Sequence, residues 1–586
     1  MKRRHVFSGA AVVAAAPVLW QGSSSIALAH QASSTGPPTV GADDLIFEPT
    51  TLRTGTPEEA GLIGAQVDRI VPETSEFLEG PTPSFPGFVV LASRNGVIVK
   101  HEAVGYRVRY ESWDEEDESP VELPEAEWEA ATTDTIYDLA SISKLFTEVV
   151  AGQFLDAGSF ELETPVVELL PEFDSLDEEK TPITIRQLLS HTSGMIAFIN
   201  LYDLPDDEAR MEAIYENPLQ FEPGTDYEYS DLNLIILATI MERLSGKSLD
   251  ELVAEGITVP LGMDDTGFNP SEVERVAATE YQPWIEERGM VRGEVHDENA
   301  WSFGGVAGHA GLFSTASDLA IFGQMVLNGG EYDSIRVLSE ETTRLIYTND
   351  NPDLPPTAAR GLGWQINQPF YMDAMTSPVT VGHTGFTGTS LVLDPLSNSM
   401  LIVLSNRVHP TREWGSDSEY RRAGARPMNR ALAVSPTQGA YAWFSEQADD
   451  ALTTLTAPLP QAVQKGRLSF DLWYDTDAGD QGSVLASPDG ETWEAVSFNA
   501  TVDGHEWSTD GTFSGFSGRQ WLKVSASLPK GTRHVRFSYE TDELYQGRGI
   551  YVDQIIVFEG LRPIFMSARR GDAEKLQLDG WVTSSD

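Results

Sequence analysis

Two hydrophobic periods occur along the chain, one typical of helices and one typical of strands. From Ser141 to Leu155 the apolar residues recur every three or four positions without a proline, which predicts a buried helix that begins at Ser141. Two apolar runs, at residues 88–91 and 97–99, flank Asn95-Gly96. Because Asn-Gly tolerates the positive φ of a tight turn, we expect a β-hairpin there. Further helices are expected around residues 184–190, 232–245 and 317–328, and further strands at residues 390–393 and 400–404.

The hydrophobic pattern changes near residue 435 and divides the chain into two folded parts. The mixed order of helices and strands predicts an α/β (α+β) domain over residues 51–435. Residues 439–560 contain short alternating strands separated by Gly, Asp and Pro turns, which predict a separate all-β sandwich. Residues 561–586 look like the start of another module, and we expect them to form a C-terminal tail.

The first 50 residues have a different character. Lys2-Arg3-Arg4 precedes a small-residue apolar stretch and then Ala27-Leu28-Ala29, which are the three parts of a secretory signal peptide over residues 1–29. The arginine pair also suits the twin-arginine export route. Residues 30–50 are rich in Ser, Gly, Pro and Ala and are expected to be a flexible leader. We therefore expect an extracellular or cell-surface protein, without a transmembrane segment because no apolar run is long enough to span a bilayer.

Composition excludes several classes of function. The chain has 39 basic and 90 acidic residues, a net charge of -51, which repels nucleic-acid phosphates and anionic lipids. No nucleic-acid partner is expected. The acids are spread along the chain, which is typical of a salt-adapted (halophilic) surface, with an ordinary acidic secreted protein as the alternative. The chain has no cysteine, so disulfides and a cysteine nucleophile are excluded.

The sharpest local pattern is Ser141-Ile142-Ser143-Lys144. At the start of a helix it places a hydroxyl and an ammonium on one face, three residues apart. A partly buried lysine can take the serine proton or hold a second base in its anionic form, and the helix N-terminus offers N–H groups to a developing oxyanion. The spacing alone is weak evidence. Ser527 and Lys530 repeat it, but Pro529 between them argues against a helix there.

Two other segments, Tyr229-Ser230-Asp231 and His383-Thr384-Gly385, supply the missing context. Together with residues 137–144, 188–194 and 304–314, in this order and spacing, they resemble the class C β-lactamase, DD-peptidase and esterase family of penicillin-recognising serine hydrolases. The resemblance covers about residues 52–432. It implies a β-lactamase/transpeptidase-like fold for the first domain and a reaction through a covalent acyl-enzyme.

The resemblance also implies a role for each residue of these motifs. Ser141 attacks the substrate carbonyl, Lys144 tunes the pair, and Tyr229, kept partly as phenolate, relays the proton. The oxyanion lies between the backbone N–H groups of Ser141 and Phe386. No cofactor is required. The substrate-binding residues that the resemblance implies are Asp231, His383, Thr384, Gly385 and Phe386.

Two positions depart from the β-lactamases of this family. Asp231 stands where Asn is usual, and His383 stands where many members carry Lys. A carboxylate at position 231 repels a substrate carboxylate, and a neutral histidine at position 383 attracts it less than an ammonium does. Together the two changes weaken the binding of a substrate carboxylate by about 1–3 kcal/mol. We therefore expect an exported serine hydrolase that acts on small-molecule esters or amides. A D-Ala-D-Ala carboxypeptidase or β-lactamase acting on a peptide or lactam, and a catalytically inactive surface-binding protein, are the alternatives.

The histidines outside these motifs are expected to have structural roles. His191 and His309 are expected to satisfy loop hydrogen bonds. No metal is expected in the catalytic domain, because the spacing of His296-Asp297-Glu298 and His309 fits no standard ligand set.

Segments at residues 468–474, 487–493 and 549–553 resemble the jelly-roll module attached to immune-inhibitor-A-like secreted peptidases. The chain has no His-Glu-x-x-His signature, so the peptidase activity does not carry over with the module. The roles considered for it are cell-surface, glycan or protein contact and simple stabilisation. The carboxylates of Asp449, Asp471 and Asp553 are candidate ligands for a structural calcium ion.

Overall fold

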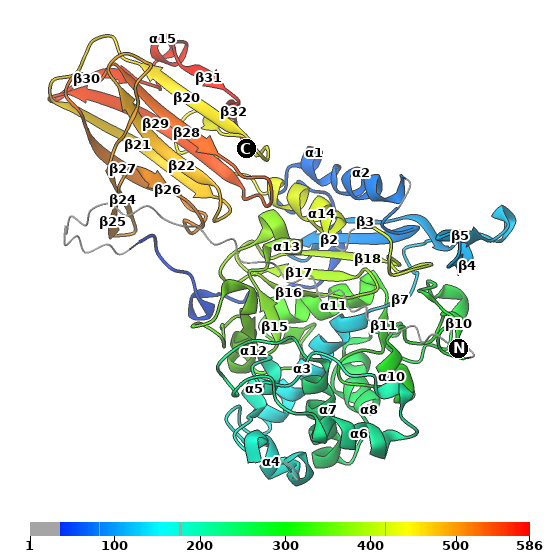
Figure 1. The fold of residues 1–586 in the computed structure, drawn as a ribbon. Coiled ribbons are helices and arrows are strands. Elements are labelled where there is room, and N and C mark those ends of the chain that lie inside the picture. The colour runs from blue at the N-terminus through cyan, green and yellow to red at the C-terminus, as the bar shows by residue number, and fades with distance from the viewer. Residues whose placement is uncertain (1–35, 81–82, 175–177, 287, 416–417) are drawn as a thin grey trace, which may run out of the picture.

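The structure is a computed structural model that describes residues 36–80, 83–174, 178–286, 288–415 and 418–586. In these residues the chain forms an α/β part and an all-β part attached beside it (Figure 1), which confirms the predicted fold class. The expected signal peptide, residues 1–29, lies outside the described residues. Within the described ranges, no helix has both the length and the apolar character that crossing a membrane demands.

A nine-stranded sheet forms the centre of the first part. The strands that position the site are β2 (Gly87–Arg94), β3 (Val97–Val108), β14 (Arg360–Gly361), β16 (Val381–Thr384), β17 (Ser390–Asp394) and β18 (Ser399–Ser405). β2 and β3 form the expected hairpin, and Asn95 and Gly96 take positive φ angles of 51° and 74°. β18 pairs antiparallel with β2 and with β17, and β17 pairs antiparallel with β16. Every residue of β17 and β18 is buried, because helices cover both faces of the sheet (Figure 1).

Three predicted helices lie on one side of the sheet, namely α3 (Ser143–Asp156), α7 (Asp231–Ser245) and α11 (Ala316–Leu327); α11 packs on β2, β17 and β18, and α7 packs on α3, further from the sheet (Figure 1). The chain enters α3 through a 3-10 turn, Ala140–Ile142, so the α-helix proper begins two residues after Ser141. The first ten residues of α3 are buried, and Phe146 stacks on Phe322 of α11 at a ring distance of 4.0 Å. A helix that is buried on all sides holds the residues at its N-terminus in a fixed position.

The second part is a sandwich of two antiparallel sheets, as predicted. Its main strands are β20 (Leu452–Pro458), β21 (Gly466–Asp475), β22 (Gln481–Ser487), β27 (Leu522–Leu528), β28 (His534–Glu540) and β29 (Gly549–Glu559). Buried and exposed residues alternate strictly along β27 because one face of its sheet meets the core and the other meets solvent.

Both expected boundaries of these parts need correction. The tail predicted at residues 561–586 belongs to the sandwich: β30 (Arg562–Met566) pairs with β29 and β31 (Gln577–Asp579) pairs with β20. Trp581 is only 3% exposed and packs in the same core. In the leader predicted at residues 30–50, Ala42 and Leu45 are buried against the first part, so the folded body begins before residue 51.

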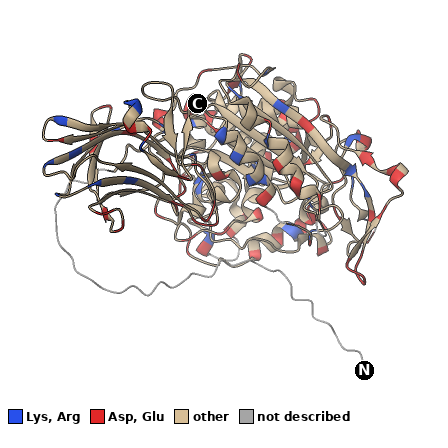
Figure 2. Ribbon diagram, turned by 90° about the horizontal axis from the view of Figure 1, so that it is seen from above, with Lys and Arg blue, Asp and Glu red and all other residues tan. Residues whose placement is uncertain are grey.

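Arginine side chains join the two parts. Arg519 of the sandwich forms ion pairs with Asp394, at the end of β17, and with Asp475 of its own part. Arg426 of α14 (Glu419–Arg430) binds Asp373 and the sandwich residue Asp449. The acidic residues are distributed over both parts of the molecule (Figure 2).

Candidate active site

Ser141 lies in a tight turn at the N-terminal end of α3. The preceding residue, Ala140, has a φ of 46°, a left-handed conformation that L-residues rarely adopt. Its backbone N–H donates a hydrogen bond to the buried Asp138 carboxylate at 2.8 Å. Strained backbone of this kind is common at active sites, where neighbouring contacts hold it in place. The turn presents Ser141 to two adjoining cavities.

Lys144 is fully buried beside Ser141. Its Nζ donates to Ser141 Oγ at 2.9 Å and to the His309 carbonyl at 3.0 Å, and it forms an ion pair with Asp231 Oδ1 at 2.8 Å. Burial by itself lowers the pKa of Lys144, but the Asp231 carboxylate and the Tyr229 phenol outweigh it, so the pKa lies above its ordinary value. Lys144 is therefore an ammonium in the resting site.

Tyr229 completes the predicted triad from the segment that leads into α7. Lys144 Nζ lies 4.9 Å from the centre of its ring. Burial raises the pKa of Tyr229 and the Asp231 carboxylate adds to this, while the charge of Lys144 only partly offsets the rise. The net direction is upward, so the resting phenol is protonated, and the expectation of a partial phenolate needs correction. The three predicted catalytic side chains are nevertheless brought together.

The turn between β16 and β17 carries the predicted oxyanion residue Phe386 and lies against the turn that holds Ser141. Thr387 Oγ1 donates to the Asp138 carbonyl at 2.7 Å, and Thr389 Oγ1 donates to the Leu139 carbonyl at 3.0 Å. A Cβ on Gly385 would lie 2.3 Å from that Leu139 oxygen. Glycine is thus required here because two backbones approach closely.

His383 and Thr384 line the cavity next to Ser141, as expected for substrate-binding residues. Burial lowers the pKa of His383 well below its ordinary value, and the cations Arg360 and Lys144 lower it further. His383 is therefore neutral, as the sequence argument assumed. Its Nδ1 lies 2.7 Å from the Thr384 carbonyl, which makes Nδ1 the protonated nitrogen.

Ser141, Tyr229 and Phe386 line both cavities, which differ in charge. One cavity, of about 290 Å³, is lined by three arginines that the sequence argument missed, Arg360, Arg407 and Arg421. The other, of about 310 Å³, is lined by three carboxylates, Asp231, Asp297 and Glu298, and by one arginine, Arg412. The three arginines of the first cavity lie in separate segments and belong to none of the recognised motifs, so the sequence offers no basis for predicting them. They place positive charge beside Ser141, in the cavity that His383 also lines.

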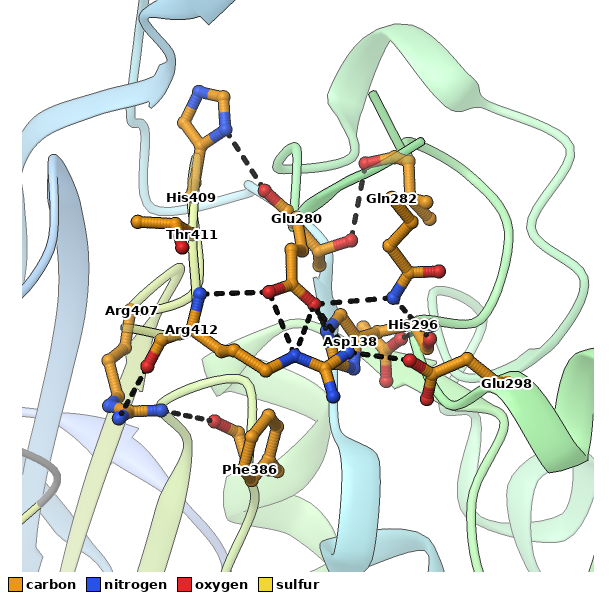
Figure 3. A network of polar contacts seen from close by, with 12 residues as sticks. Asp138, Glu280, Gln282, His296, Glu298, Phe386, Arg407, His409, Thr411 and Arg412 are labelled. Atoms are coloured by element: carbon orange, nitrogen blue, oxygen red, sulfur yellow. Dashed lines mark hydrogen bonds and ion pairs between the residues drawn. The ribbon is translucent and has the colours of Figure 1, made fainter. Parts of the chain in front are cut away.

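Behind Phe386 lies a polar network that the sequence also did not reveal (Figure 3). Arg412 binds Glu280 and Glu298, and Glu280 in turn contacts the His296 ring at 2.8 Å. The His296 backbone N–H donates to Asp138 at 2.6 Å, so the network reaches the turn that holds Ser141. The Phe386 ring lies 5.6 Å from the His296 ring and 5.5 Å from the Arg412 guanidinium carbon, so the network also contacts the oxyanion turn.

The predicted structural histidines make the expected hydrogen bonds. His191 Nδ1 accepts the backbone N–H of Ser230 at 3.1 Å, and His309 Nε2 contacts Asp297 Oδ1 at 2.8 Å. Asp297, His309 and Asp231 place ligand atoms within 4.8 Å of one another, the only such group of three among the described residues. The Lys144 ammonium contacts Asp231 at 2.8 Å, so this cluster already includes a positively charged group of the chain itself.

The three carboxylates proposed for calcium do not converge. Asp471 and Asp553 lie opposite each other on β21 and β29, and the Thr437 hydroxyl contacts both carboxylates. Asp449 instead contacts Arg426 at the junction of the two parts.

A serine, a buried lysine and a tyrosine around one helix end, on an α/β fold with a facing glycine turn, define a serine hydrolase of the β-lactamase/transpeptidase class. Comparison with known families matches residues 67–426 to the family described as "Beta-lactamase". The chain belongs to this family.

Curated relatives extend the match. A protein of Escherichia coli (strain K12) named "Putative D-alanyl-D-alanine carboxypeptidase" is 31% identical over 435 residues, which cover 68% of this chain and 94% of that protein. A protein of the same name from Salmonella agona (strain SL483) is 30% identical over 390 residues, 61% of this chain and 86% of its own length. Among solved structures, "EstCE1, a hydrolase with promiscuous acyltransferase activity" is 20% identical, covers 62% of this chain and 98% of its own, and has a TM-score of 0.47.

Proposed function

We propose that this protein is an exported serine hydrolase that forms an acyl-enzyme on Ser141 with esters or small amides. The observation that carries the proposal is the 2.9 Å hydrogen bond from Lys144 to Ser141 Oγ, with the Tyr229 phenol beside both groups. A pseudoenzyme would not need this convergence in a cleft, so a purely surface-binding role is disfavoured.

The proposed reaction uses only groups of this chain. Tyr229 first loses its proton to solvent through the cavities that it lines, and the phenolate then takes the proton of Ser141 Oγ while Oγ bonds to the substrate carbonyl carbon. The electron pair of the carbonyl moves to its oxygen, between the backbone N–H groups of Ser141 and Phe386. Collapse of this intermediate expels the leaving group, which receives the proton from Tyr229. Water then releases the acyl group by the same steps in reverse.

A second candidate is a D-Ala-D-Ala carboxypeptidase. Three arginines, Arg360, Arg407 and Arg421, line the cavity on one side of Ser141, and guanidinium groups bind carboxylates well. A peptide that ends in a free carboxylate would place that group there. The names of the curated relatives agree with this candidate.

Mass spectrometry of the protein after incubation with an ester panel, a penicillin and a D-Ala-D-Ala peptide tests both candidates. We expect an acyl adduct from the esters on the wild type and none on Ser141→Ala. Release of D-alanine, with no turnover of any ester, would favour the second candidate. Nitrocefin hydrolysis at a rate near that of p-nitrophenyl butyrate would contradict the proposed preference against β-lactams.

The remaining expectations are part of the same proposal. The basic start, apolar stretch and Ala27-Leu28-Ala29 of the N-terminus support export by a signal peptide, and the net charge of -51 supports a salt-adapted surface. For the sandwich we propose contact with the cell surface or a glycan, and a structural calcium ion at Asp471 and Asp553, whose carboxylates both contact the Thr437 hydroxyl.

A further inference from the structure

The proposed reaction requires a deprotonated Tyr229, yet the nearest cation is already engaged. Lys144 pairs with Asp231 at 2.8 Å, and Asp231 raises the pKa of Tyr229. The two histidines that face the Tyr229 ring, His191 at 4.7 Å and His383 at 5.9 Å, are neutral because burial lowers the pKa of both. A phenolate in this position therefore needs a further positive charge.

Arg360 lies in the place that such a charge would occupy. Its guanidinium carbon is 5.3 Å from the centre of the Tyr229 ring, and the residue is only 2% exposed. Two hydrogen bonds fix its orientation, one to the Gly363 carbonyl at 3.0 Å and one to the Tyr227 hydroxyl at 2.7 Å. An arginine keeps its charge when buried, and a charge in a dry site acts strongly on its neighbours.

Glu148 belongs to α3, one turn after Lys144, and its carboxyl group interacts electrostatically with Arg360. The residue is fully buried, and neither carboxyl oxygen has a hydrogen-bond partner among the described residues. Burial raises the pKa of Glu148 to about 8, against the pull of Arg360 and Lys144. A Cβ on Gly363 would lie 2.2 Å from the Glu148 carboxyl carbon, so the loop after β14 is shaped around this acid.

We propose that Arg360 is a positioning residue that stabilises the phenolate of Tyr229 during proton transfer from Ser141, and that Glu148 moderates its charge. The inference rests on the proposed function. In the step concerned, the proton leaves Ser141 Oγ for the phenolate oxygen as the Oγ–carbon bond forms. Arg360 gains or loses no proton. The positive charge of Arg360 lowers the free energy of the Tyr229 phenolate before the proton is transferred.

Spectroscopic titration of Tyr229 tests the inference without relying on activity. The tyrosinate absorbance of the full chain minus that of Tyr229→Phe isolates this residue from the other tyrosines. In the background of Arg360→Met, the Tyr229 pKa should rise by about one to two pH units, the effect of one charge at this distance. In Glu148→Gln the Tyr229 pKa should fall, because the variant lacks the carboxylate that opposes the charge of Arg360 at alkaline pH.

The acid limb of the pH profile of kcat/KM for an ester should follow the Tyr229 pKa. It should move to higher pH in Arg360→Met, and by a smaller amount in Arg360→Lys, which keeps the positive charge. Arg210→Met is the matched control, since Arg210 is also buried but lies away from the site. An Arg360→Met protein that folds, yet titrates and reacts with the wild-type pH dependence, overturns the inference. A wild type that hydrolyses no ester or amide, with Tyr229 still shifted by Arg360→Met, overturns only the proposed function.

Discussion

Asp231 is the residue whose replacement should change the pH dependence most directly. Its carboxylate raises the pKa of both Lys144 and Tyr229. In Asp231→Asn both pKa values should fall, so Tyr229, the group that must lose its proton before the reaction, does so at lower pH. We expect the acid limb of the pH profile of kcat/KM to move down by about one to two pH units.

The measurement is ester hydrolysis over a wide pH range by the wild type and Asp231→Asn. Asp226→Asn, a change at an exposed carboxylate outside the two cavities, is the control and should leave the profile unchanged. An acid limb that stays in place or moves upward in Asp231→Asn would show that this carboxylate does not set the protonation of the site.

The sequence predicted the catalytic side chains but not all the charges around them. Ser141, Lys144 and Tyr229 stand in motifs of fixed spacing, and the fold brings them together. Arg360 stands on an edge strand with no motif, and its effect arises only because the sheet places it beside Tyr229. The protonation of Tyr229 depends on burial and on Asp231, which spacing along the chain does not convey.

Among the elements, the turn between β16 and β17 is the most sensitive to side-chain size. A methyl group at Gly385 would lie 2.1 Å from Thr389 Oγ1 and 2.3 Å from the Leu139 carbonyl oxygen. Gly385→Ala must therefore push this turn away from Ser141. We expect kcat/KM to fall on the order of 100-fold, because a shift of about 1 Å misaligns the oxyanion site. Steady-state kinetics with an ester provides the measurement.

Gly267→Ala is the control for this prediction, because no atom lies within 4 Å of the added methyl group. It should keep wild-type kinetics. If Gly385→Ala also did so, the close approach of the two turns would not be needed for the reaction.

Elements with a strong local pattern were predicted well, and those stabilised by distant partners were not. The hairpin of β2 and β3 follows from Asn95-Gly96, since that pair takes the required positive φ. In contrast, β31 has three exposed residues and no alternating pattern. It exists because β20, more than a hundred residues earlier in the chain, offers an edge for pairing, and the sequence of the strand alone cannot show this.

For the whole molecule, the net charge of -51 predicts a dependence on salt. Acidic residues lie on both parts (Figure 2), so their repulsion opposes the compact state as a whole. Salt screens this repulsion within about 10 Å at 0.1 M. We expect the melting temperature to rise with sodium chloride concentration at constant pH. An equal rise in sucrose at matched water activity would assign the effect to solvent exclusion instead of charge.

Arg519 should determine how tightly the two parts unfold together. It is the shared partner of two buried carboxylates, Asp394 in the α/β part and Asp475 in the sandwich. Arg519→Met leaves both acids buried without this cation, which costs about 3–5 kcal/mol. We expect calorimetry to show one unfolding transition for the wild type and two for Arg519→Met, since the junction loses the cation that joins Asp394 to Asp475.

A double variant separates the ion pair from simple loss of packing. In Asp394→Asn/Arg519→Met one of the two unpaired charges is removed, so part of the lost stability should return, and the cycle gives the coupling energy. Arg467→Met, at an exposed arginine of β21, should change stability by less than about 0.5 kcal/mol. If Arg519→Met unfolds like the wild type, the apolar contacts of the junction suffice to hold the two parts together. Asp394 is the last residue of β17, the strand that follows the Gly385 turn. A loosened junction in Arg519→Met should therefore also lower kcat/KM. Such a decrease would show that the sandwich supports the active site through β17.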